Sequence, residues 1–390
     1  MRNTRYDFES VIDRAGTNSL KWELFDDDLP MWVADMDFEA PPEILDALRA
    51  RLDHGIFGYP KLTDDWYQSY IDWWKNRHGL TIEKDWLLFS GGIVGTVASL
   101  IRRLTAPGEN VLLMTPAYNA FLYIIAENGR KIAENRLIYD GNDYSIDWED
   151  LDKKLADPNT NLFLLCNPHN PIGRIWDRET LSRIGAMCKR HSVIVISDEI
   201  HCDLTEPGKR YVPFATVDET CREISLTCLA PTKAFNLAGI HTSASFSSNP
   251  VLRAKAASAF SLDGISSPNV FSVPATVAAF TKGERWLDEA CDYIWENRRM
   301  IRDYLAKELP MIHFVPGEAT YLLWVDVSAV TDNVEDFCKR LRAETGLFVT
   351  PGTAYGKPTG EGFFRWNLAC PHAYVQDALG RLKQFVTAHS

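Results

Sequence analysis

The chain has 390 residues, of which 46% are apolar, and its formal net charge at pH 7 is −12. This length allows a large buried core and exceeds the size at which single cores stop growing, so we expect two domains. The acidic balance, without a concentrated run of lysine or arginine, argues against nucleic acid as a partner.

The N-terminal stretch MRNTRYDFESVIDRAGTNSLKW is polar and lacks the apolar core of a signal peptide. No window reaches the roughly 18 uninterrupted apolar residues of a membrane span. The eight cysteines are scattered, with no CxxC pair and no zinc-type spacing, which favours reduced structural thiols. We therefore expect a cytoplasmic protein that binds neither a membrane nor a metal ion.

Short apolar runs alternate with amphipathic stretches over most of the chain. The expected elements are, in chain order, a helix over 64–79 that ends at Gly79, a strand at 110–115, a helix over 117–129, a strand at 161–166, a helix over 177–191 capped by Asp177, and strands at 193–197 and 223–228. This alternation predicts an α/β fold with a mainly parallel sheet and helices on both of its faces.

From about residue 285 the pattern changes. The sequence predicts one long helix over 285–309, a strand at 321–327, a shorter helix over 334–344, a strand at 363–368 and a terminal helix. This is typical of a second, smaller α+β unit, and the lack of a Gly/Ser linker indicates close packing. We expect a large domain over 45–284 and a small domain made of 1–44 and 285–390.

Polar loops follow several of the expected strands, and in open parallel sheets ligands bind outside the carboxyl ends of the strands. The stretch SGGIVGT (90–96) places glycines before an apolar helix, so its free backbone N–H groups could hold a phosphate. Taken alone, it is also typical of a tight helix start. CNPHNPIGR (166–174) offers the amides of Asn167 and Asn170, although a purely structural turn explains it equally well.

The next strand ends in SDEIHCD (197–203), which places Asp198 and His201 at its end; acidic strand ends are common, so this stretch alone does not decide. Lys233 lies in LTCLAPTKAFNLAGI (226–240), among apolar residues that offer it no evident partner. A single lysine is usually a solvated surface charge. A desolvated lysine, however, loses its proton more readily and becomes a nucleophile toward an aldehyde. Lysine, acidic residue and glycine-rich helix start are together the groups that pyridoxal 5′-phosphate requires.

Seven stretches in order carry a resemblance to a known family: MWVADMDFEAPPEI (31–44), FGYP (57–60), TPAYNAF (115–121), NPHNPIGRIW (167–176), SDEIHCDL (197–204), APTKAFNLAGI (230–240) and FFRWNLACP (363–371). The chain resembles fold type I pyridoxal-phosphate enzymes of the class I/II aminotransferase group, and most of all the MalY/PatB branch of cystathionine β-lyases, or C–S lyases. The resemblance implies the PLP-dependent transferase fold, with a mainly parallel central sheet sandwiched by helices and a smaller α+β domain.

The resemblance also implies roles around the cofactor ring. Lys233 is expected to bond the cofactor aldehyde and to act in catalysis, and Asp198 to keep the pyridine nitrogen protonated. Asn170 is expected to form a hydrogen bond with the phenolic oxygen of the cofactor. Tyr118 is expected to stack on the ring and to take part in catalysis. His201 stands near the ring where many relatives have a tyrosine.

Phosphate binding is implied for the backbone of Ile93 and Val94 and for the Thr232 hydroxyl. Tyr59 is expected to reach the phosphate from the other subunit of a homodimer. Two positions depart from the wider aminotransferase pattern, since His241 stands where an arginine is usual and Ala230 where a serine is usual. These departures agree with the lyase branch and leave the phosphate contacts incompletely assigned.

The substrate is expected to be a small amino acid, whose α-carboxylate Arg365 binds as a planar bidentate donor. Ala34 and Asn170 are expected to contribute nearby. The implied reaction is β-elimination from cystathionine or a related S-substituted cysteine, giving pyruvate, ammonia and a thiol. This would place the protein in methionine and cysteine metabolism.

Two alternatives to the lyase stay open at this level. An aminotransferase would use Lys233 and Asp198 in the same way, so these residues cannot separate the two reactions. A non-catalytic regulator could keep the fold to sense the cofactor or an amino acid. A nicotinamide dehydrogenase is disfavoured because the chain lacks the dinucleotide fingerprint.

Overall fold

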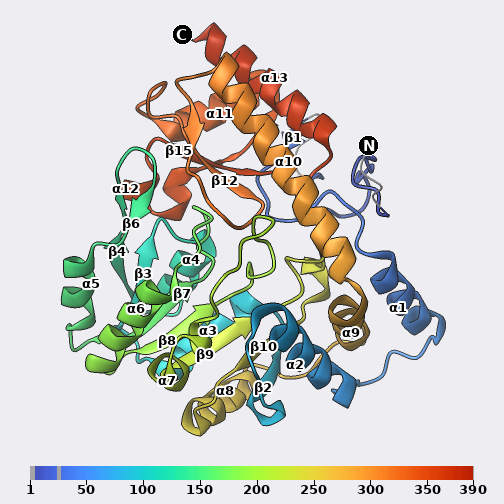
Figure 1. Ribbon diagram of the computed structural model, residues 1–390, viewed down its shortest axis with the longest axis vertical. Helices are drawn as coiled ribbons and strands as arrows, with labels where there is room; N and C mark the ends of the chain where they lie inside the picture. Colours follow the sequence, from blue (N-terminus) through green and yellow to red (C-terminus); the bar gives the residue numbers. More distant parts are fainter. Residues whose placement is uncertain (1–4, 24–27, 390) are drawn as a thin grey trace.

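The structure is a computed structural model and describes residues 5–23 and 28–389. Figure 1 shows a larger lower body around a seven-stranded sheet and a smaller upper body around a four-stranded sheet. The long helix α10 (Glu284–Glu308) runs diagonally from the lower body to the upper one, where it lies beside the C-terminal helix α13 (His372–Ala388). The two bodies are therefore joined by a continuous helix.

The central sheet has the strand order β2-β10-β9-β8-β7-β3-β4. Its strands are β2 (Leu87–Ser90), β10 (Ser243–Phe246), β9 (Ser225–Leu229), β8 (Ile194–Asp198), β7 (Thr160–Cys166), β3 (Asn110–Thr115) and β4 (Lys131–Arg136). Strand β10 runs antiparallel to both of its neighbours, whereas β9, β8, β7, β3 and β4 pair in parallel. The carboxyl ends of the parallel strands therefore meet at one edge, where a ligand site is expected.

Helices cover both faces of this sheet, and strand β7 shows why. Its residues alternate between two cores: Leu162 and Leu164 pack with α3 and α4, whereas Phe163 and Leu165 pack with α5 and α6. The helices of this body are α1 (Pro42–Asp53), α2 (Asp64–His78), α3 (Ile93–Leu104), α4 (Asn119–Glu127), α5 (Trp148–Leu155), α6 (Arg178–Arg190), α7 (Glu219–Glu223), α8 (Pro250–Leu262) and α9 (Ser272–Lys282). The predicted fold class is confirmed.

The smaller sheet is antiparallel, with the order β11-β12-β15-β14. It comprises β11 (His313–Phe314), β12 (Leu322–Asp326), β15 (Phe363–Asn367) and β14 (Thr350–Pro351), and α11 (Val334–Thr345) and α13 pack on it. Strand β1 (Leu29–Pro30) pairs with β13 (Leu347–Phe348), so the N-terminal segment lies on this smaller body. Short elements complete the fold: β5 (Ile138–Tyr139), β6 (Tyr144–Ser145) and α12 (Lys357–Gly360). Domain boundaries near residues 45 and 285 remain our proposal; the first lies within α1 and the second at the start of α10.

The local predictions largely agree with these bounds. Helix α2 ends at Gly79, which adopts the left-handed conformation with φ 68°, and the Asp177 side chain accepts a hydrogen bond from the Thr180 N–H at the start of α6. The strand predicted at 223–228 is shifted, because residues up to Glu223 belong to α7 and the strand begins at Ser225.

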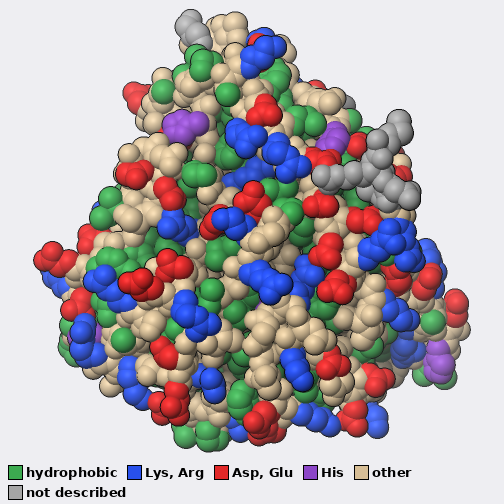
Figure 2. Space-filling model, viewed as in Figure 1, with side chains coloured by type: hydrophobic (Ala, Val, Ile, Leu, Met, Phe, Trp, Pro, Cys, Tyr) green, Lys and Arg blue, Asp and Glu red, His purple; other side chains and the backbone are tan. Residues whose placement is uncertain are grey.

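Within the described ranges, the helices are too short or too polar to cross a membrane. The face shown in Figure 2 carries acidic and basic side chains interspersed with one another, without a continuous basic surface.

Candidate active site

A pocket of about 370 Å³ opens where the loops after β7, β8 and β9 meet the start of α3. Nine of the residues that the sequence singled out line this pocket together: Ala34, Ile93, Val94, Tyr118, Asn170, Asp198, His201, Thr232 and Lys233. They come from segments up to 199 residues apart in the chain, since Lys233 contacts Ala34. The topology of the sheet therefore brings the scattered motifs to one place.

Lys233 lies four residues beyond the end of β9, and its Nζ donates a hydrogen bond to the Ala34 carbonyl at 2.5 Å. Burial and the positive charge of Arg365 lower the pKa of Lys233 to about 8, although Asp35 and Asp198 act in the opposite direction. A substantial fraction of this amine is therefore neutral near pH 8, as a nucleophile toward an aldehyde requires.

Asp198 is the last residue of β8, and it is 3% exposed. Its carboxylate accepts a hydrogen bond from the Ile200 N–H at 3.2 Å. Burial raises the pKa of Asp198 to about 7, which that hydrogen bond and the charge of Lys233 only partly oppose. A buried carboxylate of this kind is stabilised by a cationic partner such as a protonated pyridine ring.

His201 lies beside Asp198 in the pocket and is 3% exposed. Burial, together with the charges of Lys233 and Arg365, lowers the pKa of His201 to about 3, so the imidazole is neutral at pH 7. Its Nδ1 atom is buried and has no hydrogen-bond partner among the described residues. This nitrogen is available to a group bound in the pocket.

The N-terminus of α3 lines one part of the pocket. Gly92 precedes the helix with φ 119°, a value that favours glycine, and its N–H donates to the Ser243 hydroxyl at 3.0 Å. The N–H groups of the first helical turn have no acceptor within a helix, and here that turn begins with Ile93 and Val94, which line the pocket. Thr232 lines the same pocket, and so does the departing residue His241.

Arg365 lies on β15 of the smaller sheet, is 5% exposed, and contacts the pocket residue Asn170. Its Nη2 donates to the Trp32 carbonyl at 2.9 Å, its Nη1 lies 3.5 Å from Asn170 Oδ1, and the guanidinium sits 4.7 Å from the centre of the Tyr355 ring. The Nε atom is buried and has no partner within the described part of the chain. Arg365 is therefore fixed in place while keeping donor capacity for a carboxylate.

Tyr59 is the one predicted site residue that lies away from this pocket, because its side chain is fully exposed at 106%. Tyr118 precedes α4 and packs edge-on against Phe121 with ring centres 5.3 Å apart. The other predicted site residues line the pocket, apart from Arg365, which contacts the lining residue Asn170.

Three residues that line the site or contact its residues were not identified from the sequence. Tyr321, just before β12, donates its hydroxyl to the Ala34 carbonyl at 3.0 Å, and Tyr355 lies under Arg365. Cys166, the last residue of β7, lines the pocket as well. The strand-end rule applied to Asp198 would have found Cys166, whereas no motif marks the two tyrosines.

These groups fit pyridoxal phosphate. The pocket combines a desolvated lysine, a buried carboxylate, a helix N-terminus and an unpartnered nitrogen on His201, and Arg365 beside Asn170 keeps a buried Nε without a partner among the described residues. An aldehyde, a pyridinium, a phosphate and a carboxylate are the matching chemical groups.

Comparison with known proteins agrees with this reading. Residues 27–382 match the family described as aminotransferase class I and II. The chain belongs to the aminotransferase class I and II family. It is 42% identical over 382 residues to the cystathionine β-lyase PatB of Bacillus subtilis (strain 168), with 96% of this chain and 98% of PatB covered.

Two solved structures from this family show a closely similar fold. Cystalysin from Treponema denticola, whose crystal structure contains pyridoxal 5′-phosphate, matches with a TM-score of 0.95 and 32% identity over 99% of this chain and all of that one. The PLP-bound C–S lyase from Staphylococcus hominis matches with a TM-score of 0.91 and 33% identity over 98% and 99% of the two chains. The family and the type I fold inferred from the motifs are confirmed.

Proposed function

We propose that the protein is a pyridoxal-phosphate-dependent C–S β-lyase, which converts cystathionine or related S-substituted cysteines to pyruvate, ammonia and a thiol. The relatives named as cystathionine β-lyase and C–S lyase over nearly the whole chain support this function and the expected cofactor. The observation in this chain that carries the proposal is that Lys233 and Asp198 line one pocket and that Arg365 contacts Asn170, another residue of its lining.

Pyridoxal phosphate, when bound, supplies an electron-withdrawing ring that makes the α-proton of an attached amino acid acidic. We propose that Asp198 maintains the charge of that ring and that the first turn of α3 with Thr232 holds the phosphate. We propose that Asn170, Tyr118 and the neutral imidazole of His201, which line the same pocket, would contact the ring.

Lys233 moves the α-proton, because its lowered pKa of about 8 keeps a fraction of the amine in the neutral, basic form near physiological pH. Arg365 orients the substrate through its α-carboxylate, with the Ala34 backbone and Asn170 beside it. The leaving group on the β-carbon is a thiolate, whose conjugate acid has a pKa of about 8.5, so its departure needs little further assistance.

The function is tested by incubating the cofactor-loaded protein with L-cystathionine and measuring the products. We expect pyruvate, ammonia and homocysteine in equal amounts, and loss of all three in Lys233→Ala. Amino exchange that depends on an added keto acid, without pyruvate release, would instead identify an aminotransferase. Absence of turnover in the wild type would favour the third function, a non-catalytic protein that senses the cofactor or an amino acid.

We further propose a homodimer in which Tyr59 of each subunit completes the phosphate contacts of the other. The exposed position of Tyr59 supports this, as do the exposed apolar residues near it, Ile56 at 67% and Phe57 at 53%.

Mixed dimers of two defective variants test this arrangement. When subunits carrying Tyr59→Ala are exchanged with subunits carrying Lys233→Ala, one site in each hybrid combines an intact Lys233 with an intact Tyr59. Lyase activity at limiting cofactor should therefore rise well above that of either variant alone. If both residues act within one chain, mixing restores nothing.

We also propose that the enzyme works in the cytoplasm. All eight cysteines are free and buried, as is typical of a protein from a reducing compartment.

A further inference from the structure

Residues 32–37, here called the Ala34 segment, hold the backbone acceptors of the active site. The Ala34 carbonyl accepts hydrogen bonds from Lys233 Nζ and from the Tyr321 hydroxyl, and the Trp32 carbonyl accepts from Arg365. Thus both functional cations of the proposed reaction donate to this one segment. The position of the segment helps to set where Lys233 and Arg365 point.

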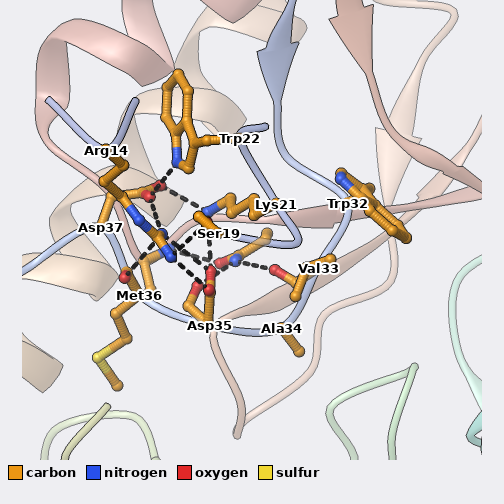
Figure 3. A network of polar contacts seen from close by, with 12 residues as sticks. Arg14, Ser19, Lys21, Trp22, Trp32, Val33, Ala34, Asp35, Met36 and Asp37 are labelled. Carbon is orange, nitrogen blue, oxygen red and sulfur yellow. Dashed lines mark hydrogen bonds and ion pairs between the residues drawn. The ribbon is translucent and has the colours of Figure 1, made fainter. Parts of the chain in front are cut away.

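The side chains of the same segment are held by cations from the N-terminal residues, as Figure 3 shows. Lys21 Nζ lies 2.6 Å from Asp37 Oδ2 and 3.4 Å from Asp35 Oδ1. Arg14 reaches both carboxylates through separate nitrogens, 2.7 Å from Asp37 and 2.8 Å from Asp35. Trp22 Nε1 adds a hydrogen bond to Asp37 at 2.9 Å.

The lysine of this ion cluster is more deeply buried than lysine side chains usually are. The Lys21 side chain is 1% exposed and that of Asp37 is 4% exposed. Burial alone would lower the pKa of Lys21, but the charges of Asp37 and Asp35 outweigh it and the pKa is raised. Lys21 therefore stays charged, and its removal would leave two carboxylates with one cation in a poorly solvated place.

The N-terminal residues contact the Ala34 segment through the side chains of Arg14, Lys21 and Trp22, and hydrogen bonds between Asn236 and the Met36 backbone hold it as well. Residues 10–22 form turns and extended chain, with no helix or strand. On its other side the segment is held by hydrogen bonds from the Asn367 amide to the Val33 and Asp35 carbonyls, both at 2.6 Å. The ion cluster and Asn367 thus fix the segment from two sides.

We propose that Lys21 is a positioning residue of the active site, which with Arg14 holds the Ala34 segment so that its carbonyls orient Lys233 and Arg365. Lys21 acts through Asp35 and Asp37 and does not itself line the pocket. The inference deepens the proposed lyase function and rests on it for the roles of Lys233 and Arg365.

The test is Lys21→Met in the cofactor-loaded enzyme, followed by hydrogen exchange and steady-state kinetics. We expect amide exchange in residues 31–38 to rise about 10-fold or more, while exchange in α10 stays unchanged, because the fault is local. We expect kcat/KM to fall about 10- to 100-fold, as for loss of a group that orients catalytic residues. Unchanged exchange in 31–38, or a change in kcat/KM below about 3-fold, overturns the inference.

Two further variants keep the test decisive. Asp37→Asn keeps the shape of the side chain and should raise exchange in 31–38 in the same way if Lys21→Met fails to fold. Arg77→Met is the control, because Arg77 also pairs with a buried carboxylate, Asp203, and its side chain is 20% exposed against 21% for Arg14. Its exchange in 31–38 should match the wild type.

The outcomes also separate this inference from the proposed function. If the wild type releases no pyruvate but Lys21→Met still loosens residues 31–38, the lyase function fails and the positioning contact stands. If the wild type is an active lyase and Lys21→Met matches it in kinetics and exchange, the positioning role fails alone.

Discussion

Replacing Asp198 with asparagine should make the cofactor-free protein more stable at pH 8 than the wild type. Burial raises the pKa of Asp198 from 3.8 to about 7, so the folded protein holds a proton there that the unfolded chain has already released. The stability that this neutral carboxyl contributes is fully present below pH 3.8 and is lost as the pH rises toward 7. Asparagine cannot ionise and escapes this loss.

The size of the effect follows from the shift. Each pKa unit corresponds to 1.36 kcal/mol, so a shift of about three units sets an upper limit of roughly 4 kcal/mol at pH 8. Relaxation around the charge reduces this to about 1–3 kcal/mol. Asparagine keeps the Oδ1 acceptor for the Ile200 N–H, so the exchange removes charge with little change in shape.

Urea unfolding of the cofactor-free proteins at pH 5 and pH 8 measures this difference. The free energy of unfolding of Asp198→Asn relative to wild type should grow in favour of the variant as the pH rises. Asp177→Asn is the control: the hydrogen bonds from Thr180 lower the pKa of Asp177 below 3.8, so the stability that its carboxylate contributes is already complete at pH 5, and the difference between wild type and that variant should stay constant between pH 5 and pH 8. An Asp198→Asn difference that does not change with pH, or that turns against the variant, would refute the reasoning.

Two predictions concern binding. Arg365→Lys keeps the charge but loses the planar pair of donors. In a pyruvate-release assay, kcat/KM for cystathionine should therefore fall about 10- to 100-fold, mainly through a higher KM. An unchanged KM would contradict the assigned role, and Arg340→Lys on the surface of α11 is the control. Gly92→Ala forces a side chain onto φ 119° at the start of α3, so pyridoxal phosphate added to cofactor-free protein should bind about 10-fold more weakly by absorbance titration, whereas Gly380→Ala should bind normally. Equal affinity for Gly92→Ala would show that this turn does not hold the phosphate.

Much of the fold could be predicted because its strands and helices carry strong periodicity. The run VIVIS and the strand NVLLMT are continuous apolar segments that occupy central positions of the parallel sheet. The edge strand β4, KIAENR, is mostly polar, and the antiparallel β10, SASF, consists mostly of small residues, so neither carries a clear strand signal. Pairing in the sheet, and not local preference, forms these two strands.

The pocket could be predicted as far as motifs mark it. Asp198 ends a strand, and Lys233 and Asn170 each lie four residues beyond one, so the topology of a parallel sheet brings them together. Tyr321 and the Arg14–Lys21 cluster reach the site only because the N-terminal segment and the smaller sheet pack against each other. Such contacts depend on tertiary packing over long sequence separations, which no local pattern encodes.

The most direct test of this account is the covalent site of the cofactor. Cofactor-saturated protein is reduced with borohydride and digested, and the peptides are analysed by mass spectrometry. The account predicts a single pyridoxyl-phosphate adduct, on the peptide that contains Lys233. An adduct on another lysine, or none at all, would contradict the central role of Lys233 and with it the roles assigned to Asp198, Arg365 and Lys21.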